Sequence, residues 1–97
     1  MGYFAVNYTY SADHARQDEL RPQHRAYLQT LFEQGHLFAS GPLPEAEPKR
    51  ALLLFRADDV DQVAGLLDAD PFRIHGLVAE RSIHLWNPVI GALADQG

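Results

Sequence analysis

The chain has 97 residues, 46% hydrophobic and 22% charged, a balance typical of one globular domain and not of a disordered segment. Its formal net charge of -5 and its scattered basic residues argue against nucleic-acid binding, which needs clustered lysine and arginine. Cysteine is absent, which excludes disulfides, thiolate nucleophiles and zinc–cysteine sites. No leader peptide or membrane-length apolar run is found, so we expect a cytoplasmic protein without membrane contact.

The N-terminal third predicts a strand followed by a long helix. Residues 3–10 are aromatic and β-branched with alternating side chains, as in a strand. One apolar helical face then follows, formed by Leu20, Tyr27, Leu28, Leu31 and Phe32.

The limits of this helix follow from two residues with special backbone properties. The helical pattern extends over residues 13–34, and Gly35 is typical of a helix C-terminus. Because Pro22 lies inside this span, we expect the continuous helix to begin only near residue 20 or 21. Residues 12–19 would then form a loop or a short separate turn.

The middle of the chain predicts two strands separated by a surface loop. Residues 36–40 form the second strand in this interpretation, and Gly41-Pro42 ends it. The loop covers residues 41–49, which include three prolines. The continuous apolar run Ala51–Phe55 is expected of a strand buried on both faces.

The last third predicts a helix and a strand. Asp58 is placed to cap a helix whose buried stripe is Val60, Val63, Ala64 and Leu67. Alternating side chains over residues 77–86 predict the final strand, followed by a short tail over residues 87–97.

This order is βαββαβ, the ferredoxin-like α+β arrangement with an antiparallel sheet, in a single domain over residues 1–97. Two helices cover only one face of a four-stranded sheet. A solvated second face would leave half of the side chains of Ala51–Phe55 in water. We therefore expect a homodimer joined through the sheets, since closed two-fold dimers are the commonest oligomers.

An imidazole interrupts the apolar face of the first helix. His24 lies at the i+4 position between Leu20 and Leu28, so it points toward the core or a cleft beside it. A buried imidazole needs a hydrogen-bond partner, and Asp70, followed by Pro71, is the best candidate. A purely structural interpretation stays open for each: His24 as a core residue whose hydrogen bonds are made within the protein, and Asp70-Pro71 as the start of a short helical turn.

The ordered motifs of the chain resemble the YCII-related domain family. They are Arg21-x-x-His24-x-x-Tyr27-Leu28, Gly35-x-Leu37, Ser40-Gly41-Pro42, Asp70-Pro71-Phe72 and Trp86. The resemblance implies a dimeric ferredoxin-like α+β barrel with an active site built on His24 and Asp70. Where this family has been tied to a reaction, it is lyase-type elimination on a small ring compound. The chain departs from the family pattern in the loop at residues 43–49, which lacks a glycine.

Two functions follow as expectations. The first is a small cofactor-independent enzyme in which His24 and Asp70 carry out acid/base chemistry on a small, cyclic molecule. The alternative is a non-catalytic dimeric module that binds a small molecule or assists a larger enzyme. No metal site is expected, because the histidines lack metal-ligand spacing.

Five further residues are expected to contact the substrate: Arg21, Ser40, Gly41, Pro42 and Phe72. Arg21 would neutralise an anionic group, or would simply pair with a surface carboxylate. Ser40-Gly41-Pro42 would let a ligand approach the backbone, or would only end a strand. For Phe72, as for Trp86, the competing interpretation is core packing.

Overall fold

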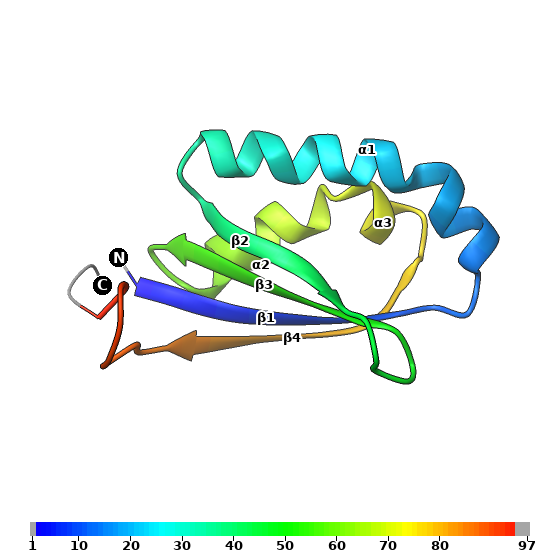
Figure 1. The fold of residues 1–97 in the computed structure, drawn as a ribbon. Helices are drawn as coiled ribbons and strands as arrows, with labels where there is room; N and C mark the ends of the chain where they lie inside the picture. Colours follow the sequence, from blue (N-terminus) through cyan, green and yellow to red (C-terminus); the bar gives the residue numbers. More distant parts are fainter. Residues whose placement is uncertain (1, 95–97) are drawn as a thin grey trace.

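The computed structural model describes residues 2–94 and shows a four-stranded antiparallel sheet with its helices on one face (Figure 1). In chain order the elements are β1 (Gly2–Tyr10), α1 (His14–Glu33), β2 (Leu37–Leu43), β3 (Arg50–Ala57), α2 (Val60–Asp68), α3 (Pro71–Ile74) and β4 (Val78–Trp86). The strand order in the sheet is β2-β3-β1-β4, with all neighbours antiparallel. The ferredoxin-like α+β prediction is confirmed.

The core lies between the sheet and the helices, as the alternation of β1 requires. Val6, on the helix-facing side, pairs with Leu53 of β3 and with Ile83 of β4. Val6, Tyr8 and Phe55 are fully buried. The remaining buried apolar residues of this layer are Phe4, Leu20, Leu28, Leu31, Leu37, Ala51, Leu53, Ala57, Val63, Leu67, Phe72, Leu77 and Val78.

The helix α1 is longer than the sequence predicted. It begins at His14 and continues through Pro22, so the expected loop over residues 12–19 is wrong. Asp13 caps the first turn by accepting a hydrogen bond from the Arg16 backbone at 3.1 Å. The buried Gln17 holds this turn against the sheet, since its Nε2 donates to the Ser11 carbonyl at 2.7 Å. These contacts offset the loss of the one backbone hydrogen bond that Pro22 removes. The turns of α1 before Pro22 bend away from the axis of the rest of the helix (Figure 1).

The C-terminal end of α1 follows the prediction. Gly35 has a φ of 84°, and its N–H and that of His36 donate to the carbonyls of Phe32 and Leu31. This pair of bonds is the Schellman motif, which needs the left-handed conformation that glycine adopts without strain. The predicted apolar face of α1 is wrong at one residue, because Phe32 is 54% exposed instead of buried.

The strand β2 also extends further than predicted. It continues through Gly41-Pro42 to Leu43, so these residues do not end it, and the loop is shorter than residues 41–49. Because β2 is an edge strand, it tolerates a proline that donates no ladder hydrogen bond. The sequence could not reveal which strand lies at the edge.

The structure differs from the prediction in smaller ways at the starts of the helices and of the last strand in the second half of the chain. Asp59, not Asp58, caps α2 by accepting from the Gln62 backbone at 2.8 Å. The turn after α2 is a separate helix, α3, and β4 begins at Val78, one residue later than predicted. Among residues 2–94, no helix is long and apolar enough to cross a membrane.

The second face of the sheet carries no helix (Figure 1). Tyr3 lies on this face and packs against Phe38 and Trp86, with ring centroids 4.9 and 6.4 Å apart. Trp86 and Leu52 remain 37% and 36% exposed. Within residues 2–94, two buried side-chain polar atoms have no hydrogen-bond partner, the Tyr3 hydroxyl and Arg56 Nε, and Tyr3 and Arg56 pair across β1 and β3. We call this surface the open face.

Candidate active site

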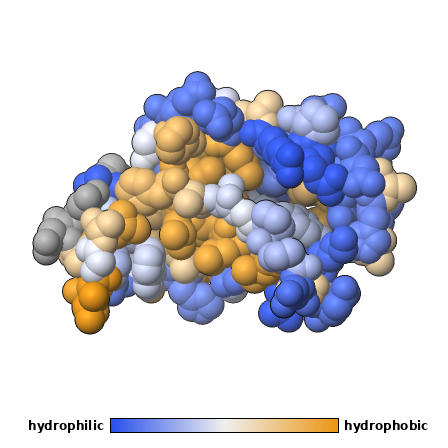
Figure 2. Space-filling view, viewed as in Figure 1, coloured by the Kyte–Doolittle hydropathy of each residue, from blue (hydrophilic) through white to orange (hydrophobic). Residues whose placement is uncertain are grey.

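A cavity of about 780 Å³ lies between α1, β2 and the adjoining ends of β1 and β3. Its size falls within the range of roughly 300–1,000 Å³ typical of small-molecule sites. Figure 2 shows apolar side chains gathered over β2 and below the polar outer surface of α1. The residues that the sequence singled out meet here: the cavity is lined by Arg21, His24, Ser40, Gly41, Pro42 and Phe72.

His24 is held by two contacts from the segment after α2. Its Nδ1 lies 2.7 Å from Asp70 Oδ1, which confirms the predicted proximity of the pair. Its ring stacks on Phe72, with centroids 4.0 Å apart and planes 2° from parallel. The helical position between Leu20 and Leu28 supplies the direction, and Asp70 and Phe72 fix the orientation of the ring. Only 8% of the side chain is exposed.

Asp70 is fully buried and accepts three hydrogen bonds. Its Oδ1 accepts from His24 Nδ1 and from the Phe72 backbone at 3.0 Å, and its Oδ2 accepts from the Tyr8 hydroxyl at 3.1 Å. Three converging donors are the environment that suits a carboxylate, which only accepts. The two interpretations of Asp70-Pro71 are therefore both correct, since the same carboxylate caps α3 and contacts His24.

The helix α3 is short, yet its closing turn fixes Phe72. Gly76 has a φ of 72°, which allows the Leu77 N–H to donate to the Phe72 carbonyl at 2.8 Å. Phe72 and Leu77 are both buried, as expected of the apolar contact that accompanies this motif. The ring beneath His24 is thus held by backbone hydrogen bonds at both ends of a four-residue helix.

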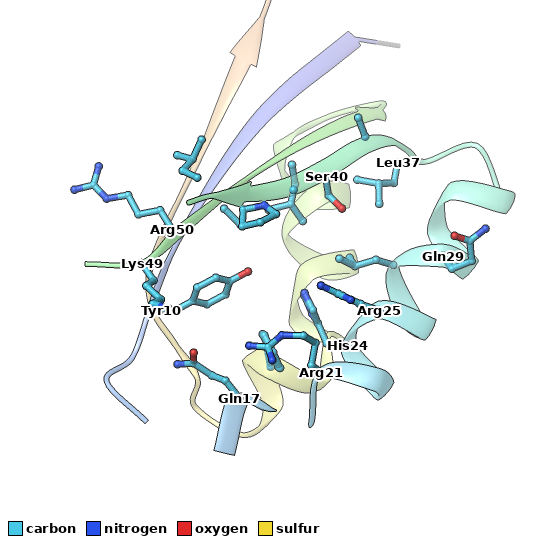
Figure 3. A pocket seen from close by; sticks show the side chains of 18 of the residues that line it. Tyr10, Gln17, Arg21, His24, Arg25, Gln29, Leu37, Ser40, Lys49 and Arg50 are labelled. Carbon is cyan, nitrogen blue, oxygen red and sulfur yellow. The ribbon is translucent and has the colours of Figure 1, made fainter. Parts of the chain in front are cut away.

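The hydrogen bond to Asp70 determines the tautomer of neutral His24. Because a carboxylate cannot donate, Nδ1 carries the proton and Nε2 is left as an acceptor. Nε2 has no hydrogen-bond partner among residues 2–94, and His24 lines the cavity (Figure 3). A proton acceptor with a fixed orientation therefore faces a space large enough for a small ring compound.

Two tyrosines on the helix-facing side of β1 belong to this environment. Burial, reinforced by the nearby Asp70 carboxylate, raises the pKa of Tyr8 far above its usual value, so Tyr8 stays a donor to that carboxylate. Burial and, secondarily, Asp70 raise the pKa of Tyr10 to about 12. The Tyr10 ring packs edge-on against Phe72, with centroids 5.7 Å apart, and its hydroxyl points toward α1 across the cavity (Figure 3).

Arg21 pairs with a surface carboxylate, as one of its two interpretations predicted, and its role toward an anionic ligand stays a prediction. It pairs with the exposed Asp18 one turn earlier in α1, and this hydrogen bond lowers the pKa of Asp18. It also lines the cavity beside His24. The pairing uses Arg21 Nη1, which leaves the rest of the guanidinium group available to a ligand.

Ser40, Gly41 and Pro42 form one wall of the cavity as part of β2. Ser40 is exposed, and a Cβ added to Gly41 would meet no atom within 4 Å. The glycine is therefore not required by close packing within the chain. Trp86, the other aromatic of the family motifs, does not line this cavity and lies on the open face.

The sequence interpretation missed several cavity residues. Tyr10, Arg25, Lys49 and Arg50 all line it. Tyr10 was predictable in principle, because it continues the helix-facing alternation of β1. Lys49 was not, since its approach depends on the backbone hydrogen bond from Tyr10 N to the Lys49 carbonyl at 2.9 Å. Across the described residues, no group of three histidine, aspartate or glutamate side chains is placed to bind a metal.

Comparisons with known proteins agree with this architecture. A solved 5-chloro-2-hydroxyhydroquinone dehydrochlorinase (TftG) from Burkholderia phenoliruptrix AC1100, in complex with 2,5-dihydroxybenzoquinone, is similar with a TM-score of 0.73 and 20% identity. The match covers 88% of this chain and 93% of that one. An uncharacterized NIPSNAP domain protein from Burkholderia xenovorans is similar with a TM-score of 0.52 and 16% identity, over 91% and 94% of the two chains. At these identities the likeness shows the fold alone.

No curated protein sequence matches at a significant level. The family model of the YCII-related domain matches residues 1–87, which is nearly the whole chain. The fold and this match together show that the chain belongs to the YCII-related domain family.

Proposed function

We propose that this protein is a small acid/base enzyme of the lyase type, in which His24 moves a proton of a small cyclic substrate. The observation that carries the proposal is the orientation of His24: Nδ1 is bound to buried Asp70, and Nε2 faces the cavity. A fixed imidazole with one free nitrogen is the arrangement that general base catalysis needs. The proposed chemistry uses protein groups only, so we expect no cofactor.

In this proposal the reaction is an elimination. Nε2 takes a proton from a substrate carbon, the C–H electron pair becomes the new double bond, and the leaving group departs from the adjacent carbon with its bonding electrons. The imidazolium is stabilised by the Asp70 carboxylate and by the face of Phe72, and then returns the proton to water. For a chlorinated hydroxyhydroquinone, the compound named for the structurally similar dehydrochlorinase, the ring is aromatic, so the same base would first move a hydroxyl proton to the ring carbon that bears chlorine and give the ketone tautomer. Loss of a second hydroxyl proton and of chloride, with the electron pairs shifting through the ring double bond, then leaves a hydroxyquinone.

The test compares wild type with His24→Asn. The Asn amide keeps an N–H donor near the position of Nδ1 and removes Nε2, so Asp70 retains its partner. With 5-chloro-2-hydroxyhydroquinone, chloride release should fall by about 10²-fold or more, the range expected for loss of a general base. Arg16→Gln, an exposed change on the same helix outside the cavity, should retain activity. Equal rates in wild type and His24→Asn would refute the proposed role of His24.

A second readout covers the case in which this substrate is wrong. Wild type should accelerate exchange of acidic C–H protons with D₂O in a panel of small cyclic ketones and enones, followed by proton NMR. His24→Asn should not. Binding in the cavity without any exchange would favour the alternative function, a non-catalytic small-molecule-binding module.

We further propose that the protein is a homodimer joined through the open face. Leu52 and Trp86 are exposed on this face. A second copy would cover both side chains and remove them from water. Sedimentation equilibrium at micromolar concentration should give twice the chain mass for wild type and one chain mass for Leu52→Asp. Ile74→Asp, the same kind of change at a more exposed apolar residue of α3, should stay dimeric, and a monomeric wild type would refute the proposal.

A further inference from the structure

The charged residues that line the cavity are all basic. Four of the eight basic residues of the chain line it: Arg21, Arg25, Lys49 and Arg50. None of the acidic residues that the structure describes does, although the chain has 13 acidic residues and a formal net charge of -5. The rest of the surface is therefore acidic, and the cavity is its positive exception. Clefts with walls of one sign concentrate ligands of the opposite sign.

Three of these cations have no ion pair within the described part of the chain. Only Arg21 does, with Asp18, whereas Arg25, Lys49 and Arg50 pair with no carboxylate. Of the four arginines outside the cavity, three pair with a carboxylate, Arg16 with Glu19 and Arg73 and Arg81 with Asp68. Among the described residues Arg56 has no such pair. The difference is not explained by a shortage of carboxylates in the chain. It leaves Arg25 and Lys49 available to an occupant of the cavity, whereas the guanidinium group of Arg50 points away from it (Figure 3).

A neutral hydrogen-bond donor, the Tyr10 hydroxyl, also lines the cavity. The Tyr10 hydroxyl has no hydrogen-bond partner among residues 2–94 and points into the cavity (Figure 3). With a pKa near 12 it keeps its proton at neutral pH. Arg25 and His24 face it from α1, so a ligand oxygen placed between Tyr10 and Arg25 would also be close to Nε2 (Figure 3).

We propose that the substrate of this cavity is an anion: a small ring compound that carries an ionised oxygen, such as an acidic enol, phenol or carboxylate group. In this arrangement Arg25 and the Tyr10 hydroxyl hold the oxygen next to the reacting carbon, and Lys49 supplies the opposite side of the positive field. The inference rests on the proposed elimination for its role in catalysis. Removal of a proton by Nε2 places further negative charge on the same oxygen, and preoriented donors stabilise such charge most strongly when it develops.

Binding of known anions tests this directly. The first probe is 2,5-dihydroxybenzoquinone, whose hydroxyl groups are vinylogous acids and are ionised at neutral pH. Calorimetry should show binding that weakens about tenfold or more between 50 and 500 mM NaCl, because screening acts on exposed charges. The matched pair benzoate and benzamide then isolates charge on one ring, with the His24 ring resonances as the NMR readout. Benzoate should bind about tenfold more tightly than benzamide, as expected for charge-assisted hydrogen bonds.

Variants locate the anion in the cavity. Arg25→Gln and Lys49→Gln should each weaken 2,5-dihydroxybenzoquinone several-fold, and the double variant more than either. Arg16→Gln removes the same charge from the same helix outside the cavity and should leave the affinity unchanged. Equal binding of benzoate and benzamide, no effect of Arg25→Gln and Lys49→Gln, or no binding of any anion at millimolar concentration would each overturn the inference.

These outcomes separate the inference from the proposed function. His24→Asn should still bind 2,5-dihydroxybenzoquinone, since the cations remain, while it loses proton exchange. Anion binding by a wild type that catalyses no exchange would refute the enzyme and keep the anion site. If the protein turned over neutral ring compounds only and bound no anion, the anion site would be refuted and the proposed enzyme function would be kept.

Discussion

The two sides of the His24 ring differ in how fully their polar groups are satisfied. Behind the ring, Asp70 is fully buried, and both of its oxygens accept hydrogen bonds. In front, Nε2, the Tyr10 hydroxyl and the Arg25 guanidinium have no partners within the described residues. Fully satisfied buried networks are rigid, whereas unpaired groups at a cavity are open to a ligand. Stability and recognition are therefore divided between the two sides, and mutations on each should have different consequences.

The largest effect on stability is expected for Asp70→Ala. The change leaves the Tyr8 hydroxyl, His24 Nδ1 and the Phe72 N–H without their acceptor in a dry environment. We expect the free energy of unfolding to fall by about 3 kcal/mol or more, at ~1–3 kcal/mol per buried unsatisfied group with partial relaxation. Urea unfolding measures it. Asp68→Ala, which removes an exposed carboxylate from α2, is the control and should cost less than about 1 kcal/mol. Similar losses in both variants would contradict the comparison.

Tyr8→Phe should have the next largest effect. It removes one of the three donors to buried Asp70 and keeps the ring in the core. The expected loss is about 1–2 kcal/mol, the cost of an unmade hydrogen bond to a charged group. Tyr10→Phe is the matched control, because the Tyr10 hydroxyl has no partner in the described chain; it should change stability by less than about 0.5 kcal/mol. A larger loss of stability in Tyr10→Phe than in Tyr8→Phe would mean that the hydrogen bond from Tyr8 to Asp70 does not stabilise the fold.

The same two tyrosines predict the alkaline limit of stability. The pKa values of Tyr8 and Tyr10 are raised in the folded state, so above pH 10 the unfolded chain loses protons that the folded chain keeps. The free energy of unfolding is therefore unaffected by these groups below about pH 10 and falls as the pH rises further, at up to ~1.4 kcal/mol per pH unit for each tyrosine. Urea unfolding between pH 9 and 11.5 should show the decline, and Tyr8→Phe should reduce its slope. An unchanged slope in Tyr8→Phe would show that Tyr8 ionises normally.

The smallest effects are expected for the cations in front of the ring. Arg25 and Lys49 are exposed and unpaired with carboxylates, so Arg25→Gln and Lys49→Gln should each change the free energy of unfolding by less than about 0.5 kcal/mol. Thermal melts at low and high salt check this. A loss of more than about 1 kcal/mol in either variant would show that the cation serves the fold instead of a ligand.

Local sequence signals predicted the elements wherever they agreed with the tertiary context. The alternation of β1, the C-terminal Gly35 of α1 and the meeting of His24 with Asp70 were all correct. The start of α1 was wrong because Pro22 alone suggests a break, while Asp13 and Gln17 provide compensating contacts that only the folded chain reveals. Pattern rules are weakest where one residue's preference competes with long-range contacts.

The candidate site was predicted better on its buried side than on its exposed side. A histidine in an apolar stripe is anomalous in sequence, and the anomaly itself calls for a partner. An exposed arginine or lysine is ordinary, so nothing in the sequence distinguished Arg25 or Lys49 from Arg16. Their convergence depends on β2 following α1 as an edge strand and on the loop that brings Lys49 beside Tyr10.

The hydrogen bonds of Asp70 also bear on when the candidate site forms as the chain folds. They join Asp70 to His24 and to Tyr8, which lie 46 and 62 positions away in the sequence. Contacts of such long range form late, because the intervening chain must first lose much of its freedom. A folding chain with α1 complete but α3 undocked has the imidazole without its carboxylate. The recovery of the proposed catalytic activity during refolding would therefore report the docking of α3 on α1, after the bulk of helical structure has returned.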